Sequence, residues 1–185
     1  MTNRAGLLGT LRRLFRPAGR TAAQGSPEAV PLSAGLEPGR GGPNATVEIV
    51  PPPPDGLQLS YAPEVDGDPD AGEIIWTWVP YDENDGRGKD RPVLIVGRQD
   101  EEWVYGVRLT SKSHDGDRDF FAIGTGRWDA QARPSWVDVE QLYRVHHSGM
   151  RREASVLDLD RFVRVADVLH RRYGWAVTGP RDSRA

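Results

Sequence analysis

The absence of cysteine from this chain of 185 residues excludes disulfides, thiol nucleophiles and cysteine-ligated metals. A formal net charge of −3 argues against a protein that coats nucleic acid or acidic membranes by bulk electrostatics, so any site for a polyanion must be local. No apolar run approaches the ~20 residues of a membrane span, and Arg12 and Arg13 interrupt the N-terminal leucines, unlike a signal peptide, so we expect a cytoplasmic protein.

Prolines and glycines are concentrated at the N-terminal end. Residues 1–70 hold 11 of the 15 prolines but none of the 6 tryptophans. A segment of this composition does not bury enough apolar surface to offset the entropy lost on ordering it. We therefore predict a disordered Pro/Gly-rich leader over residues 1–70, a folded domain over residues 71–177 and a flexible tail over residues 178–185.

The leader begins with a basic arm. Residues 4–20 carry five arginines and no acid, and Leu7, Leu11 and Leu14 have helical spacing. This pattern allows a short amphipathic helix that contacts a partner or a membrane surface. An isolated helix of this length is marginal, so an unstructured arm is the preferred interpretation. Residues 17–69 are interpreted as linker.

Strands are predicted from Glu73 onward. Pro92 must lie at the beginning of its strand, and residues 81–90, which are polar and contain glycine, predict an exposed loop. A turn at residues 99–101 makes the second and third strands a hairpin. The predicted strands are rich in β-branched and aromatic residues and comprise residues 73–80, 91–97, 103–109, 120–123 and 135–143.

Near the C-terminal end the spacing of apolar residues changes from the pattern of strands to the period of a helix, which predicts one helix. Asp158 or Asp160 is suited to the N-cap and Gly174 to the stop. Strands followed by one packed helix predict a small α+β barrel. The apolar stripe of the helix consists of Phe162, Val165, Ala166, Leu169 and Tyr173.

Two patterns that resemble catalytic or metal sites fail on spacing. Ser113, His114 and Asp115 are consecutive, and consecutive residues do not converge as nucleophile, base and orienting acid. His146 and His147 are adjacent and lack a partner at metal-ligand spacing, so we interpret them as surface histidines. No metal and no other cofactor is expected.

The remaining candidate site lies where two neighbouring strands of the predicted hairpin end. This hairpin places Arg91 and Thr110 at the open ends of the two strands, where their side chains can meet. A guanidinium with hydroxyls, a lysine and a histidine around it binds a phosphodiester and stabilises charge that develops on it. Three acids in the preceding loop, Asp82, Glu83 and Asp85, oppose this basic character. The other candidate residues are Arg87, Lys89, Ser111, Lys112 and His114.

Three segments of the chain, in order, resemble the PemK/MazF family of type II toxin–antitoxin endoribonucleases. They are Gly72–Trp76, Gly88–Val96 and Leu109–Lys112, and a weaker similarity continues through Ser135–Val145 and the closing helix. The resemblance covers about residues 72–175. The chain departs from the family in its long leader, in its acidic loop and in an apparent insertion at residues 124–134.

The resemblance implies an SH3-like barrel with a packed C-terminal helix that forms a homodimer and is inhibited by a cognate antitoxin. It also implies cleavage of single-stranded RNA at short sequences without a metal, with the RNA 2′-hydroxyl as nucleophile. The catalytic arginine of the family falls on Arg91, and its threonine or serine on Thr110 and Ser111. A guanidinium has a pKa of about 12, so Arg91 stays protonated near neutral pH and is not suited to act as the base. It is therefore expected to stabilise the phosphorane.

Several alternatives stay open. Arg87, Lys89, Lys112 and His114 are expected to bind RNA, with solvated loop charges as the other interpretation. The whole domain is alternatively a non-catalytic SH3-like barrel that binds RNA or a peptide, and the leader a tether to a membrane or partner. For Arg91 the structural alternative is a salt bridge to Asp90 or Glu73. Base stacking is weighed against core or dimer packing for Trp76, Trp78 and Trp103.

Overall fold

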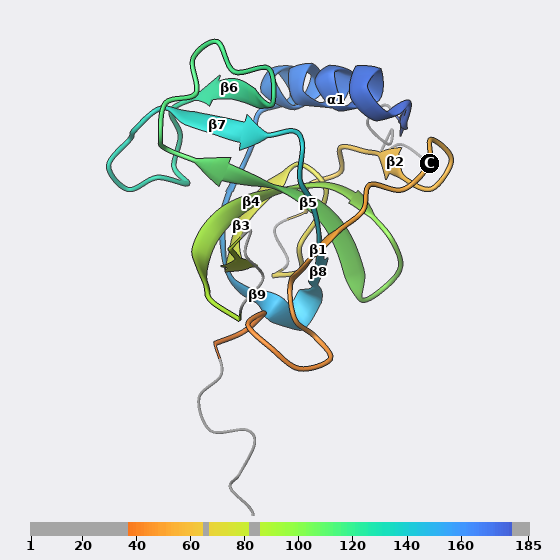
Figure 1. Cartoon of the computed structure of the whole chain (residues 1–185), viewed down its shortest axis with the longest axis vertical. Coiled ribbons are helices and arrows are strands. Elements are labelled where there is room, and N and C mark those ends of the chain that lie inside the picture. The colour runs from red at the N-terminus through yellow and green to blue at the C-terminus, as the bar shows by residue number, and fades with distance from the viewer. Residues whose placement is uncertain (1–36, 65–66, 82–85, 179–185) are drawn as a thin grey trace, which may run out of the picture. The chain divides into compact units, whose positions relative to one another are not determined.

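The structure is a computed structural model that describes residues 37–64, 67–81 and 86–178 (Figure 1). The basic arm at residues 4–20, the acids of the loop at residues 82–85 and the tail from residue 179 lie outside these ranges. The described residues form β1 (Val47–Ile49), β2 (Gln58–Leu59), β3 (Glu73–Pro80), β4 (Gly88–Arg98), β5 (Trp103–Thr110), β6 (Phe120–Gly124), β7 (Ser135–Asp138), β8 (Leu142–His146), a 3-10 turn (His147–Gly149), β9 (Met150–Val156), α1 (Leu159–Tyr173) and β10 (Ala176–Val177).

The architecture is a mostly antiparallel sheet with one α-helix near the C-terminal end. The strand order of the main sheet is β1-β8-β5-β4-β3-β9, β7 pairs with β5 and β6, and β2 and β10 form a small parallel pair. Among the described strands the pairings do not close into a ring, because β1 and β9 end the order. The predicted β4–β5 hairpin is confirmed, with Val93 opposite Arg108 and Leu94 opposite Val107.

Strand β4 is the centre of the core, as its apolar run predicted. Leu94 and Val96 pack into one cluster with α1, and Val93 and Ile95 pack into a second cluster on the other side of the strand. All four side chains are fully buried. Alternate residues of a strand point to opposite faces, so a strand covered on both faces needs apolar residues throughout.

The helix and both of its ends agree with the prediction. The side chain of Asp158 accepts a hydrogen bond from the backbone N–H of Arg161, which makes Asp158 the N-cap. Gly174 ends the helix with a φ of 77°, a left-handed conformation in which glycine carries no Cβ penalty. The apolar stripe is buried against the sheet at Phe162, Val165, Ala166 and Leu169.

The single strand predicted over residues 135–143 is wrong, because the chain turns between β7 and β8. Asp138 is buried, and its Oδ1 accepts hydrogen bonds from the backbone N–H groups of Glu140 and Gln141. Its Oδ2 accepts from Nε of Arg108 at 2.9 Å. A side chain that satisfies the backbone two and three residues ahead replaces the ladder with a turn. The predicted loop at residues 81–90 is likewise wrong at residues 88–90, which belong to β4.

The interpretation of residues 17–69 as linker is wrong for residues 37–64. Strand β1 pairs with β8, and Leu57 and Leu59 lie in the core cluster beneath α1. The hydroxyl of Tyr61 donates to the carbonyl of Leu157, and Nε1 of Trp175 donates to the carbonyl of Pro52. Because this segment docks on apolar surface supplied by later residues, it needs no core of its own.

Candidate active site

A pocket of about 240 Å3 lies where β4 and β5 meet, at the strand ends that the sequence singled out. The structure brings five of the predicted residues into its walls: Lys89, Arg91, Thr110, Ser111 and Lys112. Antiparallel pairing of β4 with β5 produces this arrangement, since it places the beginning of one strand beside the end of the other.

The hydroxyl of Thr110 is oriented by the backbone. Its Oγ1 accepts a hydrogen bond from the backbone N–H of Lys112 at 3.2 Å, so the chain turns back at the end of β5. An oxygen that accepts in this way keeps its own proton for donation to a ligand. The exposed hydroxyl of Ser111 and the ammonium of Lys112 follow on the same turn and line the same pocket.

One wall of the pocket comes from the segment that looked like an insertion, and sequence reasoning missed it. Trp128, Asp129 and Arg133 line the pocket. Trp128 is only 4% exposed and its Nε1 donates to Oγ of Ser135 at 3.0 Å, which fixes the segment to the sheet. A tryptophan in an otherwise polar segment was the available signal, because a side chain of that size is usually at least partly buried.

Asp129 and Arg133 form an ion pair at the pocket. Nε of Arg133 donates to Oδ2 of Asp129 at 2.9 Å, and the Arg133 side chain is half exposed. The hydrogen bond from Arg133, with a further one from the backbone N–H of Gln131, holds the pKa of Asp129 below its ordinary value. Asp129 is therefore ionised at neutral pH and partly offsets the positive charge of the pocket.

The pocket also contains Asp90, one of the two acids considered as a salt-bridge partner of Arg91. Asp90 lies on β4 and forms an ion pair with Arg151 of β9, the strand on the other side of β3. The other acid, Glu73, is fully buried, and its Oε2 accepts a hydrogen bond from the backbone N–H of Asp70 at 3.1 Å. Both carboxylates thus have structural contacts outside the pocket.

Two of the predicted RNA-binding residues do not line this pocket. The ring of His114 stacks on Phe120 with centroids 3.5 Å apart, and its Nδ1 lies 3.4 Å from a carboxylate oxygen of Asp117. Arg87 lines a different pocket of about 660 Å3, together with Arg40 and Trp78. Of the four residues expected to bind RNA, Lys89 and Lys112 therefore line the candidate pocket and Arg87 and His114 do not.

The three tryptophans weighed as base-stacking platforms occupy different environments. Trp76 lines the candidate pocket. The guanidinium of Arg40 lies 4.6 Å from the ring centroid of Trp78, and that of Arg144 lies 4.2 Å from the ring centroid of Trp103. These cation–π contacts cover one face of each of the two rings. Among the three tryptophans, Trp76 is the one that lines the candidate pocket.

The fold and the pocket define a small domain that brings guanidinium, hydroxyl and lysine groups together at a strand end, a set of donors suited to phosphate oxygens. The family model described as "PemK-like, MazF-like toxin of type II toxin-antitoxin system" matches residues 70–172, and the chain belongs to this family. No curated protein matches the chain. None of the helices in the part of the chain that the structure describes is long and apolar enough to cross a membrane.

Several solved structures are similar to this chain at low identity. A MazE–MazF complex from Deinococcus radiodurans has 16% identity and a TM-score of 0.44, covering 58% of this chain and 98% of its own. Mycobacterium tuberculosis toxin MazF-mt6 has 16% identity and a TM-score of 0.42, covering 56% of this chain and 97% of its own. An endoribonuclease in complex with its cognate antitoxin from Mycobacterial species has 16% identity and a TM-score of 0.44, covering 56% and 93%.

Proposed function

We propose that this chain is a toxin endoribonuclease that cleaves single-stranded RNA at short sequences without a metal. The observation that supports the proposal is the convergence of Arg91, Thr110 and Ser111 with two lysines in one pocket of a chain that belongs to the PemK/MazF family. Such a donor set recognises the oxygens of a phosphodiester and stabilises additional negative charge on them.

In the proposed reaction, the RNA 2′-hydroxyl loses its proton and attacks the adjacent phosphorus. The new P–O2′ bond forms as the P–O5′ bond breaks, and the 5′-oxygen leaves with a proton, so the products are a cyclic phosphate and a 5′-hydroxyl end. Charge accumulates on the non-bridging oxygens in the transition state. The permanently protonated guanidinium of Arg91 stabilises this charge, and the hydroxyls of Thr110 and Ser111 donate hydrogen bonds to the same group.

Binding of the RNA strand is assigned to the periphery of the pocket. Lys89 and Lys112 are exposed and contact backbone phosphates. Trp76 provides a ring on which a base stacks. The half-exposed fork of Arg133 presents donors to a base edge, so the insertion contributes to the choice of cleavage sequence. Arg87 and His114 lie outside the pocket, and we assign them to contacts with RNA further along the surface.

The family description extends the proposal to partners. A type II toxin is controlled by an antitoxin protein, so we expect a cognate antitoxin to bind this chain and suppress cleavage. A homodimer, an SH3-like barrel and a cytoplasmic location belong to the same proposal. Size-exclusion chromatography with light scattering at several concentrations tests the dimer, for which a monomer at all concentrations is the contrary result.

The test is cleavage of a long single-stranded RNA in excess chelator, with mapping of the new ends. We expect cuts at a short recurring sequence, and Arg91→Ala to lower the rate by about 10²–10³-fold, the usual cost of removing one transition-state donor. Arg91→Lys keeps the positive charge but loses the planar, paired N–H donors of the guanidinium, so its rate should lie between those of Arg91→Ala and the parent protein. Arg98→Ala is the matched control, because Arg98 lies on the same strand but pairs with Asp70 at the other end.

The competing function is a non-catalytic domain that binds RNA or a peptide. The Asp129–Arg133 ion pair favours it, because a carboxylate beside the pocket weakens the attraction for a phosphate. Folded protein free of antitoxin that binds RNA without turnover would establish this alternative. Cleavage by Arg91→Ala at the rate of the parent protein would remove Arg91 from the site.

A further inference from the structure

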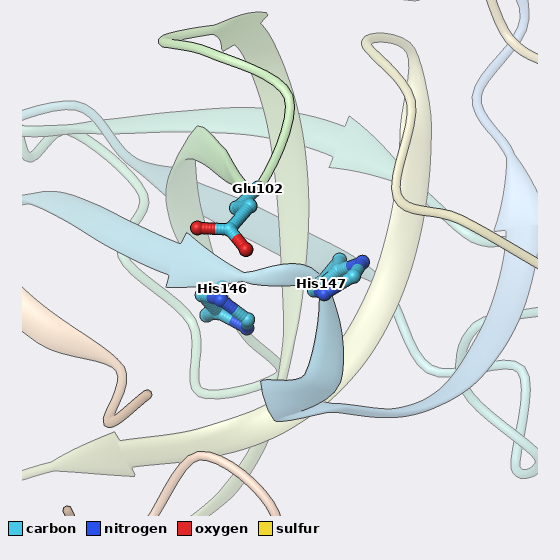
Figure 2. Close-up of side chains that lie close together, drawn as sticks. All are labelled: Glu102, His146 and His147. Carbon is cyan, nitrogen blue, oxygen red and sulfur yellow. The ribbon is translucent and has the colours of Figure 1, made fainter. Parts of the chain in front are cut away.

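Three potential metal ligands gather where β8 runs into the 3-10 turn. Glu102, His146 and His147 each offer one ligand atom, and these atoms all lie within 4.8 Å of one another (Figure 2). His146 is only 5% exposed, so the interpretation of both residues as surface histidines is wrong for His146. The third potential ligand, which spacing along the sequence did not indicate, is Glu102 in the turn between β4 and β5.

Strand pairing holds the backbone of all three residues in place. His146 lies opposite Trp103 in the β5–β8 pair, so the residue before Trp103 is brought to the end of β8. The backbone N–H of His147 donates to the carbonyl of Glu102 at 2.9 Å. The ring of Trp103 meets that of His146 edge-on, with centroids 4.8 Å apart, and fixes the plane of the imidazole.

Hydrogen bonding orients the buried imidazole for coordination. Nδ1 of His146 accepts a hydrogen bond from the backbone N–H of Ser148 at 3.1 Å and lies 2.8 Å from Oγ of the same residue. Coordination through Nε2 needs the ring proton on Nδ1, where it donates to Oγ of Ser148 in place of the bond accepted from the backbone N–H. Nδ2 of Asn44 donates to the same Oγ at 2.9 Å and holds it in position. Metal-binding histidines commonly have an acceptor of this kind behind them.

A second carboxylate lies at the edge of the cluster. Oδ1 of Asp68 is 3.9 Å from Nδ1 of His147, and both side chains are exposed. Its negative charge favours a cation at the cluster and orients the His147 ring. Glu102 and Asp68 together balance the charge of a divalent ion, while the two imidazoles supply nitrogen.

We propose that Glu102, His146 and His147 bind a divalent transition-metal ion of the zinc type through two imidazole nitrogens and one carboxylate oxygen. Imidazole and carboxylate ligands in this number suit Zn²⁺, with water at the fourth position. With bonds of about 2.0–2.1 Å, tetrahedral ligands lie about 3.3 Å apart. The exposed side chains of Glu102 and His147 close this gap by rotating toward the fixed ring of His146.

The metal site is separate from the proposed ribonuclease pocket. Trp103 begins β5 and Thr110 ends it, which puts the two sites seven strand steps of about 3.3 Å apart, or about 23 Å. At that distance the ion takes no part in the chemistry at Arg91. It ties the β4–β5 turn to the corner between β8 and β9 and stabilises that end of the sheet.

The site is tested by titrating tag-free, chelator-stripped full-length protein with Zn²⁺ by calorimetry and with Co²⁺ by visible absorption. We expect one ion per chain and the absorption bands of nitrogen- and oxygen-ligated cobalt. Loss of an outer-shell partner typically weakens a metal site 10–100-fold, so His147→Ala and Glu102→Gln, which remove ligands, should weaken binding at least about tenfold. Ser148→Ala should weaken it while leaving the stoichiometry unchanged.

His114→Ala is the matched control, because it removes one histidine elsewhere on the surface and should leave the affinity for Zn²⁺ unchanged. Absence of saturable binding, or equal affinity in His147→Ala, Glu102→Gln and the control, would overturn the proposal. The outcome is independent of RNA cleavage, since metal binding is read directly and the cleavage assay is run in chelator.

Discussion

Leu59→Ala tests whether the folded unit includes residues far upstream of the first predicted strand. Leu59 is 0% exposed and lies in the core cluster with Leu57 and the apolar face of α1. Its backbone carbonyl accepts from the N–H of Thr178, and the next N–H, of Ser60, donates to the carbonyl of Val96. The substitution leaves these backbone bonds in place, so it isolates the contribution of the side chain.

The expected loss follows from burial and from the cavity. Full burial of a leucine side chain contributes about 1.5–3 kcal/mol, and truncation in a close-packed core adds the cost of an unfilled cavity. We therefore expect Leu59→Ala to lower the free energy of unfolding by about 2–5 kcal/mol. Such a loss is a large fraction of the ~5–15 kcal/mol that stabilises a typical domain.

Urea unfolding followed by tryptophan fluorescence measures this loss, because Trp175 is fully buried in the same cluster. Val50→Ala is the control: Val50 lies in the same N-terminal segment but is 88% exposed, so its truncation should change stability by less than about 0.5 kcal/mol. A change of that small size for Leu59→Ala would refute the reasoning. The core would then begin near Gly72, as composition alone had suggested.

Two further predictions concern the N-terminal end of α1. Asp158→Ala removes the acceptor for the N–H of Arg161 and should cost about 1 kcal/mol in denaturant unfolding, whereas Asp158→Asn should cost much less. Burial, with the charge of Asp158 adding, raises the pKa of Tyr61 above its ordinary 10.0, so its hydrogen bond to Leu157 stabilises the fold fully below pH 10.0 and is lost as pH rises through the raised pKa. Tyr61→Phe should therefore be less stable by about 1 kcal/mol at neutral pH, and a stability difference that stays constant above pH 10.0 would contradict this.

The elements that the sequence predicted are those whose signals are local and periodic. The run from Val93 to Val96 has apolar residues at every position, and only a strand covered on both faces requires that. The helix combined a stripe of 3.6-residue period with an N-cap at Asp158 and a glycine at its end, and each signal agreed with the others. Arg91 and Thr110 came together because a hairpin leaves little freedom in where its strand ends lie.

The elements that the sequence did not predict depend on contacts between distant segments. Leu57 and Leu59 are too few to indicate a core, and apolar residues of the main sheet and of α1 bury them. Trp128 has no apolar neighbour larger than alanine at strand or helix spacing, yet its Nε1 donates to Oγ of Ser135 and it lines the pocket. Glu102 reaches the histidines only through the register of β5 and β8. Composition and hydrophobic period describe residues that are close together along the chain. Each of these three contacts depends on residues that only the fold brings together.

The start of α1 is coupled to the wall of the candidate active site. Asp158 caps the helix and also pairs with Arg161, whose Nη1 donates to the carbonyl of Thr125 at 2.8 Å. The same guanidinium lies 6.0 Å from the ring centroid of Trp128, the anchor of the segment that lines the pocket. Because these contacts join the segment to the helix, we expect a ligand that displaces Arg161 to shift Asp129 and Arg133. If the proposed ribonuclease is controlled by an antitoxin, we expect binding at this helix end to alter the choice of RNA sequence more than the contacts of Arg91 with phosphate.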